Sequence, residues 1–279
     1  MSSRVIRFNA ESFREQHRRD RSDAMPVATS KVPQVAIAFW IIKIAATTLG
    51  ETGGDALSMT LNFGYLLSSI IFMACFLIAL WVQVRAKRFH PFLYWTVIVT
   101  TTTVGTTMAD YADRSLGVGY TGGSLILFVI LMAVLALWRH SEEKVSFSDI
   151  NSPRVEIFYW VTILFSNTLG TALGDFLADT PGVGYERGAL VFGGALSLVA
   201  LAYYLTNMSR TMLFWAAFIL TRPLGATLGD LLTKPANTGG LNLSRITSSL
   251  VIAGFMVLCI ILTEQKAGEH PGNPKSSEN

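Results

Sequence analysis

A segment of about 55 residues occurs four times in this chain, and this repetition constrains the fold more than any other feature. Each copy has a tryptophan, a glycine ten residues later, an aspartate five residues after that, and a second glycine nine residues further on. Units of this kind stack on one another, because one unit cannot bury its apolar face alone. The four sets are Trp40, Gly50, Asp55 and Gly64; Trp95, Gly105, Asp110 and Gly119; Trp160, Gly170, Asp175 and Gly184; and Trp215, Gly225, Asp230 and Gly239.

Each copy contains two apolar windows that are long enough to cross a bilayer. Of the 279 residues, 51% are hydrophobic and only 15% are charged, whereas a soluble domain carries about 25% charged residues. We therefore predict an all-α, polytopic membrane bundle of eight transmembrane helices, built as four parallel two-helix repeats. The windows lie near 34–54, 65–84, 92–112, 121–138, 156–177, 187–206, 211–232 and 246–263.

The repeats divide the chain without a separate soluble domain. Ten extra residues, EEKVSFSDIN, precede the third copy and group the repeats as two plus two. We expect a bundle with fourfold or nested twofold pseudosymmetry, and not the inverted repeats of many transporters. The predicted segments are a basic tail (1–32), repeat 1 (33–90), repeat 2 (91–140), a linker (141–154), repeat 3 (155–209), repeat 4 (210–264) and a second tail (265–279).

The distribution of basic residues predicts the orientation. Sixteen lysines and arginines fall in tails and loops on one side of the predicted spans, and four fall on the other. By the positive-inside rule, both termini are predicted to be cytoplasmic. The first 32 residues are polar and basic, so no signal peptide is expected. The net charge of +3 thus reflects topology and gives no reason to expect a nucleic-acid partner.

The first helix of each repeat carries a polar stripe. Positions 0, 7, 8, 11 and 15 counted from the tryptophan fall within about 80° of one another on a helix. Such a stripe is costly against lipid, so the four stripes should meet at a shared axis or face a wet cavity. Their members are Trp40, Thr47, Thr48, Glu51 and Asp55; Trp95, Thr102, Thr103, Thr106 and Asp110; Trp160, Asn167, Thr168, Thr171 and Asp175; and Trp215, Arg222, Pro223, Ala226 and Asp230.

Two basic residues lie inside the predicted spans and are candidate counter-charges for these acids. Lys43 and Arg222 face five acids, Glu51 and the four repeated aspartates, which leaves a formal charge of −3. We expect protons, bound cations or water to balance that excess. Carboxylate and hydroxyl oxygens suit hard cations such as Mn, Mg or Ca. The predicted metal ligands are Asp55, Asp110, Asp175 and Asp230.

Small residues beside the stripes predict close contact between helices. Lipid provides little hydrophobic drive between helices, so small-xxx-small pairs allow backbones to approach. The packing pairs are Gly50 with Gly54, Gly105 with Ala109, Gly170 with Gly174, and Gly225 with Gly229.

Simpler roles exist for the other stripe residues. We predict that the tryptophans anchor the helices at the lipid interface. The threonines can bond carbonyls of their own helices, and the aspartates can cap the next helix. Both cysteines, Cys75 and Cys259, lie in apolar windows and are expected to pack there.

The chain resembles a bacterial family of uncharacterised membrane-anchored proteins. The resemblance rests on NTLGTALGD at 167–175, PLGATLGD at 223–230 and the segment GDLLTKPANTGGLNLSRITSSLV at 229–251, and it covers about residues 33–263. It implies a multi-pass protein of the bacterial inner membrane and no established activity. The first copy departs from the pattern, with Glu51 where the others have Thr or Ala.

The leading hypothesis is a secondary transporter or channel for a small cation, a proton or a hard divalent metal such as Mn. The pathway residues would be Glu51 and the four aspartates with Thr47, Thr48, Thr102, Thr103, Asn167 and Thr168. The alternative is a non-transporting scaffold whose stripes are interhelical packing. No nucleophile–base set is visible, so no enzyme is predicted. No cofactor is required, and the cluster of acids offers a place for a bound divalent cation. The predicted partners are the bilayer and a small cation, and a homo-oligomer is compatible with this.

Overall fold

The computed structural model describes residues 31, 33–86, 88–142, 153–178 and 183–266. Within them the chain is helical, and every predicted apolar window corresponds to one long α-helix. The helices are α2 (Ile37–Asp55), α3 (Gly64–Arg85), α4 (Pro91–Asp110), α5 (Gly119–Glu142), α6 (Pro153–Ala178), α7 (Gly184–Leu205), α8 (Arg210–Thr233) and α9 (Arg245–Leu262).

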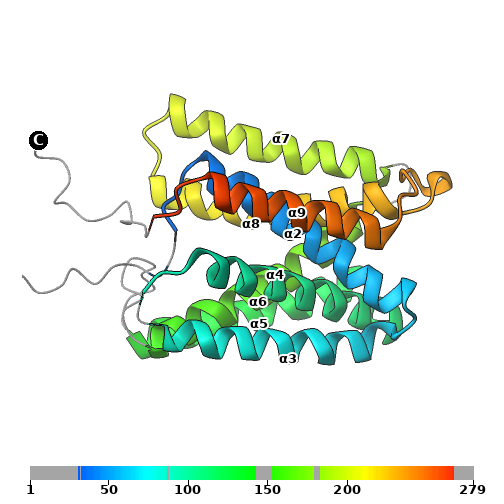
Figure 1. Cartoon of the computed structure of the whole chain (residues 1–279), viewed down its shortest axis with the longest axis horizontal. Coiled ribbons are helices and arrows are strands. Elements are labelled where there is room, and N and C mark those ends of the chain that lie inside the picture. The colour runs from blue at the N-terminus through cyan, green and yellow to red at the C-terminus, as the bar shows by residue number, and fades with distance from the viewer. Residues whose placement is uncertain (1–30, 32, 87, 143–152, 179–182, 267–279) are drawn as a thin grey trace, which may run out of the picture.

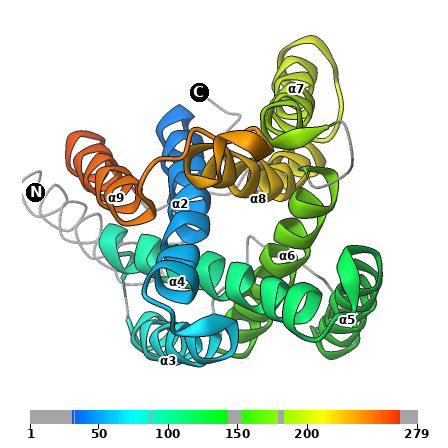
Figure 2. The ribbon, with the colours of Figure 1, turned by 90° about the vertical axis from the view of Figure 1, so that its right-hand side faces the viewer.

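The first helices of the four repeats form a closed inner ring. Helices α2, α4, α6 and α8 pack in chain order, and α8 closes the ring on α2 (Figure 2). The second helices lie outside this ring. Each packs chiefly on the inner helix of the next repeat: α3 on α4, α5 on α6, α7 on α8, and α9 on α2. The outer helix of the fourth repeat therefore packs on the inner helix of the first, and the four repeats form a closed ring.

Six of the described helices are long and apolar enough to span a membrane, namely α3, α5, α6, α7, α8 and α9. The outer helix α3 has a mean hydropathy of 2.4 with 17% of its span buried, whereas the inner helix α6 has 1.3 with 61% buried. Helices α2 and α4 do not meet this criterion, because α2 carries Lys43, Glu51 and Asp55 and α4 is rich in threonine. Their polar residues belong to the ring interior and not to a lipid-facing surface.

The second repeated glycine makes the turn before each outer helix. Gly64, Gly119, Gly184 and Gly239 have φ angles of 73°, 73°, 72° and 88°, a region that strains residues with a β-carbon. In the first two repeats a π-helical turn follows the aspartate, at Ala56–Thr60 and Tyr111–Ser115. The turns lie at one end of the bundle, which we call the loop end (Figure 1).

The opposite end, which we call the termini end, is filled by aromatic side chains. Here the backbone N–H of Gln34 donates to the carbonyl of Lys266 at 2.9 Å, so the two ends of the described chain lie together. Trp95 and Trp160 are each 1% exposed. Ring centroids lie 5.5 Å apart for Phe39 and Trp95 and 5.8 Å for Tyr94 and Trp160.

The prediction that the repeated tryptophans are interface anchors is therefore wrong for Trp95 and Trp160. They occupy the hydrophobic core because position 0 lies on the same face as the polar stripe. Trp40 and Trp215 are partly buried against this core, and both pack on Phe214, with centroids 5.6 Å and 5.2 Å away.

Candidate functional site

The inner helices meet at glycines that repeat around the ring. The glycine ten residues after the tryptophan of one repeat packs against the residue seven after the tryptophan of the next repeat. A β-carbon added at Gly50 would lie 2.3 Å from the Thr102 hydroxyl oxygen, and one at Gly225 would lie 2.2 Å from that of Thr47. Because four such seams occur in one register, the four polar stripes are held against the ring axis. The pairs are Gly50 with Thr102, Gly105 with Asn167 and Thr168, Gly170 with Arg222, and Gly225 with Thr47.

The structure buries the polar stripe residues. Their hydroxyl, amide and charged members are at most 6% exposed: Thr47, Thr48, Glu51, Asp55, Thr102, Thr103, Thr106, Asp110, Asn167, Thr168, Thr171, Asp175, Arg222 and Asp230.

Five carboxylates from all four inner helices gather near the loop end, and we call them the acid cluster. Oxygen atoms of Glu51, Asp55 and Asp110 lie within 4.8 Å of one another. The same limit holds for Glu51, Asp175 and Asp230. Glu51 belongs to both groups and is therefore the central member. The aspartates do not cap the outer helices α3, α7 and α9, whose N-cap residues are Phe63, Val183 and Ser244.

Arg222 crosses the ring and connects three other helices. Its Nη1 lies 3.5 Å from Glu51 Oε2, and its Nη2 donates to the carbonyl of Thr102 at 3.1 Å and to the hydroxyl of Thr106 at 2.6 Å. It also donates to the Thr171 hydroxyl. Thr106 in turn donates to Glu51 Oε2 at 3.0 Å. The planar guanidinium, with five donors in a fixed fork, suits this position.

Lys234 neutralises two acids at the loop end. Its ammonium lies 2.8 Å from Asp55 Oδ2 and 3.1 Å from Asp230 Oδ1, so it bridges α2 and α8. Burial alone would lower the pKa of Lys234, but Asp230 and Asp55 outweigh it and raise that pKa well above its ordinary value. Lys234 thus places a positive charge between the two acids.

Arg114 and Arg245 complete the basic set. Arg114 Nε lies 2.8 Å from Asp110 Oδ1 and its Nη2 lies 3.7 Å from Asp175 Oδ2, so it bridges α4 and α6. Arg245 Nε lies 3.5 Å from Asp55 Oδ2. Arg114, Lys234 and Arg245 lie outside the apolar windows of the sequence, so their contact with the acids was not predicted.

The charge of the cluster differs from the value expected from sequence. Five acids (Glu51, Asp55, Asp110, Asp175, Asp230) against four bases (Arg114, Arg222, Lys234, Arg245) leave a formal −1. The expected −3 counted only Lys43 and Arg222 as bases. Carboxylate oxygens are the type of ligand that a hard cation prefers. A divalent ion would, however, have to compete with Arg114, Lys234 and the other bases that already contact these oxygens.

Lys43 lies away from the acids. It is fully buried, and its Nζ lies 4.3 Å from the centre of the Phe218 ring with no hydrogen-bond acceptor among the described residues. Eight residues separate it from Glu51, about 12 Å along a helix. The prediction that Lys43 is a counter-charge for the acids is therefore wrong, because its ammonium packs on the Phe218 ring.

Several stripe threonines bond their own helices. Thr48 donates to the carbonyl of Ile44 at 2.9 Å, Thr103 to that of Val99 at 2.8 Å, and Thr168 to that of Leu164 at 2.9 Å. All three stand at position 8 of their repeats. This local bonding matches the simpler alternative for these hydroxyls.

One family matches the chain. The sequence model described as "Repeat of Unknown Function (DUF347)" matches residues 38–89, 93–144, 158–209 and 213–263. The chain belongs to this repeat family. No curated protein and no solved structure matches it. Each DUF347 match begins two residues before one of the repeated tryptophans, so the family's unit coincides with the repeat found in the sequence.

The four DUF347 copies differ in charge although their backbones repeat. Glu51 stands at position 11 only in the first copy, and Arg222 stands at position 7 only in the fourth. Arg114 and Lys234 share position 19 of the second and fourth copies, four residues after the aspartate. That shared position is the sequence signal that would have revealed them. The fourfold ring therefore carries an approximately twofold arrangement of basic residues.

Proposed function

We propose that this protein is a membrane transport protein for a small cation or proton, a secondary transporter or channel that acts through the acid cluster. All eight long helices would span the bacterial inner membrane, with the termini end cytoplasmic. The observation that carries the proposal is the acid cluster itself, in which carboxylates from all four inner helices converge at the ring axis. Ionisable groups buried in a membrane are costly and typically mark ion or proton pathways.

The acid cluster and its four bases carry a formal charge of −1, which one proton or one monovalent cation would neutralise. Glu51 would hold the proton or cation, because it belongs to both carboxylate groups, with the Thr106 hydroxyl and Arg222 beside its Oε2. Arg222 would fix the position of Glu51. A divalent metal would bind at Asp55, Asp110, Asp175 and Asp230 when Lys234 and Arg114 move away.

Among the described residues, aromatic and basic side chains lie at the two ends of the proposed pathway. Trp95, Trp160 and their aromatic neighbours fill the termini end, and Lys234 and Arg114 lie across the acids at the loop end. Transport would require these two barriers to open alternately or together.

The test is ion flux in proteoliposomes that contain the purified protein. Proton flux is followed with an entrapped pH dye and Mn²⁺ uptake with an entrapped metal dye. We expect the double variant Asp110→Asn/Asp175→Asn to abolish flux, while Glu186→Gln, an exposed acid at the start of α7, retains it. Undiminished flux in the double variant would refute the role of the acid cluster.

The second candidate is a non-transporting membrane scaffold, and the close packing of the ring favours it. The glycine seams leave no room for a β-carbon, and four basic residues lie within ion-pair distance of the acids. Hydrogen bonds between helices inside membranes contribute roughly 0.6 kcal/mol each. Several of them would help to hold the inner helices together in a protein that transports nothing. Wild-type protein that carries neither protons nor Mn²⁺ in the same liposomes would favour the scaffold.

A further inference from the structure

The Lys43 ammonium is enclosed by the bundle without an acceptor for its protons. The side chain is fully buried, and Nζ has no hydrogen-bond partner among the described residues. Its aromatic neighbour is Phe218, whose ring centre lies 4.3 Å from Nζ. Contact with an aromatic ring offsets only part of the cost of taking a charge out of water. The charged form of Lys43 therefore requires either a bound anion or a ready way to lose its proton.

Apolar side chains stand level with Lys43 on the other inner helices. Three residues after the tryptophan, where the first repeat has Lys43, the other repeats have Ile98, Ile163 and Phe218. These three side chains are at most 3% exposed. Lys43 thus places one polar group in an otherwise apolar layer of the ring, between the aromatic side chains of the termini end and the acid cluster.

The charged groups of the neighbouring helices lie farther toward the loop end. Helix α2 packs on α4, α8 and α9. On α8 the next charge is Arg222, a second cation, and on α2 it is Glu51, about 12 Å along the helix. On α4 it is Asp110, about 18 Å beyond the level of Lys43, and on α9 it is Arg245, the first residue of the helix. The other titratable side chains of α4, α8 and α9 are Tyr94, Cys259, Arg210 and Asp230.

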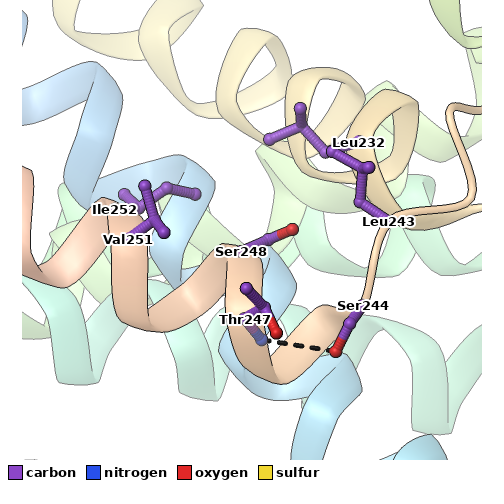
Figure 3. Close-up of a pocket in the computed structure, with 7 residues that line it drawn as sticks. All are labelled: Leu232, Leu243, Ser244, Thr247, Ser248, Val251 and Ile252. Carbon is purple, nitrogen blue, oxygen red and sulfur yellow. Dashed lines mark hydrogen bonds between the residues drawn. The ribbon is translucent and has the colours of Figure 1, made fainter.

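The two hollows on the outside of the bundle offer no space for an anion beside Lys43. Figure 3 shows the smaller one, between α8 and α9. On α2 the larger one is lined by Ile41, Ile44, Ala45 and Thr48. These residues lie about 150° around the helix from Lys43, and neither hollow is lined by Lys43 or Phe218. Release of the proton removes the cost of the buried charge without an anion.

A layer of buried hydroxyl and amide groups lies between Lys43 and the acid cluster. These groups come from all four inner helices, six or seven residues after the tryptophans, and are at most 2% exposed: Thr47, Thr101, Thr102, Asn167 and Thr221. The Asn167 amide donates to the Thr101 hydroxyl at 3.2 Å. Because a hydroxyl group can both donate and accept a hydrogen bond, such a layer can pass a proton between an amine on one side and carboxylates on the other.

We propose that Lys43 is a proton-binding residue of the pathway and that the transported ion is the proton. Nζ takes up a proton from the termini end to become –NH3⁺ and releases it toward the acid cluster to become –NH2 again. One N–H bond forms and one breaks, and no other bond changes. A metal cation is excluded from this route, because the protonated amine repels it. The inference rests on the proposed transport function and narrows its substrate to protons.

The test is proton flux in proteoliposomes with three variants of Lys43. Lys43→Met has a side chain of similar length that binds no proton, and Lys43→Arg keeps a charge that does not leave. We expect each to reduce proton flux about tenfold or more. Lys43→His carries an imidazole that binds and releases protons, so its flux should exceed that of Lys43→Met. The control Ile41→Met, at a position on the outer face of α2 that is 44% exposed, should match wild type.

The outcomes separate this inference from the function on which it rests. Wild-type protein that carries Mn²⁺ but no protons would overturn the inference and leave the transport function standing. Wild-type proton flux in Lys43→Met or Lys43→Arg would also overturn it, because a transferable proton at this position would then be unnecessary. Equal losses in Lys43→His and Lys43→Met would overturn it by assigning the side chain to packing. Circular dichroism establishes that each variant is folded before its flux is measured.

Discussion

Gly225→Ala tests whether the ring is closed by direct contact between α8 and α2. The added β-carbon would lie 2.2 Å from Thr47 Oγ1, 2.4 Å from its Cβ and 2.8 Å from its backbone carbonyl carbon. Backbone atoms cannot rotate away as a side chain can, so the two helices must separate. Overpacking of this kind costs about 1–3 kcal/mol.

The matched control is Gly53→Ala on α2, where an added β-carbon meets nothing within 4 Å. Alanine improves helix propensity by about 1 kcal/mol at either position, so this gain cancels in the comparison. We expect the free energy of unfolding of Gly225→Ala to be lower than that of Gly53→Ala by about 1–3 kcal/mol. Circular dichroism during unfolding of the detergent-solubilised protein by sodium dodecyl sulfate measures both values. Equal stability of the two variants would refute the close seam.

Three further predictions concern the charges and the core. Lys234→Met leaves Asp55 and Asp230 without their shared ammonium and should destabilise the protein by about 3–5 kcal/mol; Lys234→Arg is the control, and unchanged stability of Lys234→Met in the same unfolding assay would contradict the ion pairs. Glu51→Gln combined with Arg222→Gln should be closer to wild type than the sum of the single variants, because the pair is coupled; strict additivity would show that the two groups do not interact. Trp95→Ala should cost about 3–5 kcal/mol, whereas Trp81→Ala, on the outer face of α3 with 56% exposure, should cost far less; similar losses at both positions would place Trp95 outside the core.

The register of the repeat predicted much of this structure. Fixed offsets from the tryptophans determine which residues share a helix face, so the helices and the inward stripes followed directly. The same reasoning could have predicted that Trp95 and Trp160 are buried, since position 0 lies on the same helix face as the polar stripe. The prediction that these tryptophans anchor the helices at the lipid interface was based instead on the general preference of tryptophan for that interface.

Other features depended on contacts between distant parts of the chain. No local sequence pattern predicts that α3 packs on α4 and not on α2. The partner of each outer helix depends on how the four inner helices are arranged in the ring. Lys43 and Arg222 looked equivalent in sequence, yet one meets an aromatic ring and the other a carboxylate. Which of them reaches an acid depends on the neighbour that each helix receives.

The packing of α9 on α2 also bears on how such a protein can evolve. An open solenoid gains or loses units at its ends, because every unit adds the same interface to the last one. Here the last outer helix already occupies the surface that the first inner helix offers, so a fifth copy would have no place and a chain of three would leave a seam unfilled. The number of units is therefore fixed by the closed ring, whereas single substitutions, such as those that place Glu51 and Arg222 in one copy each, leave the ring intact.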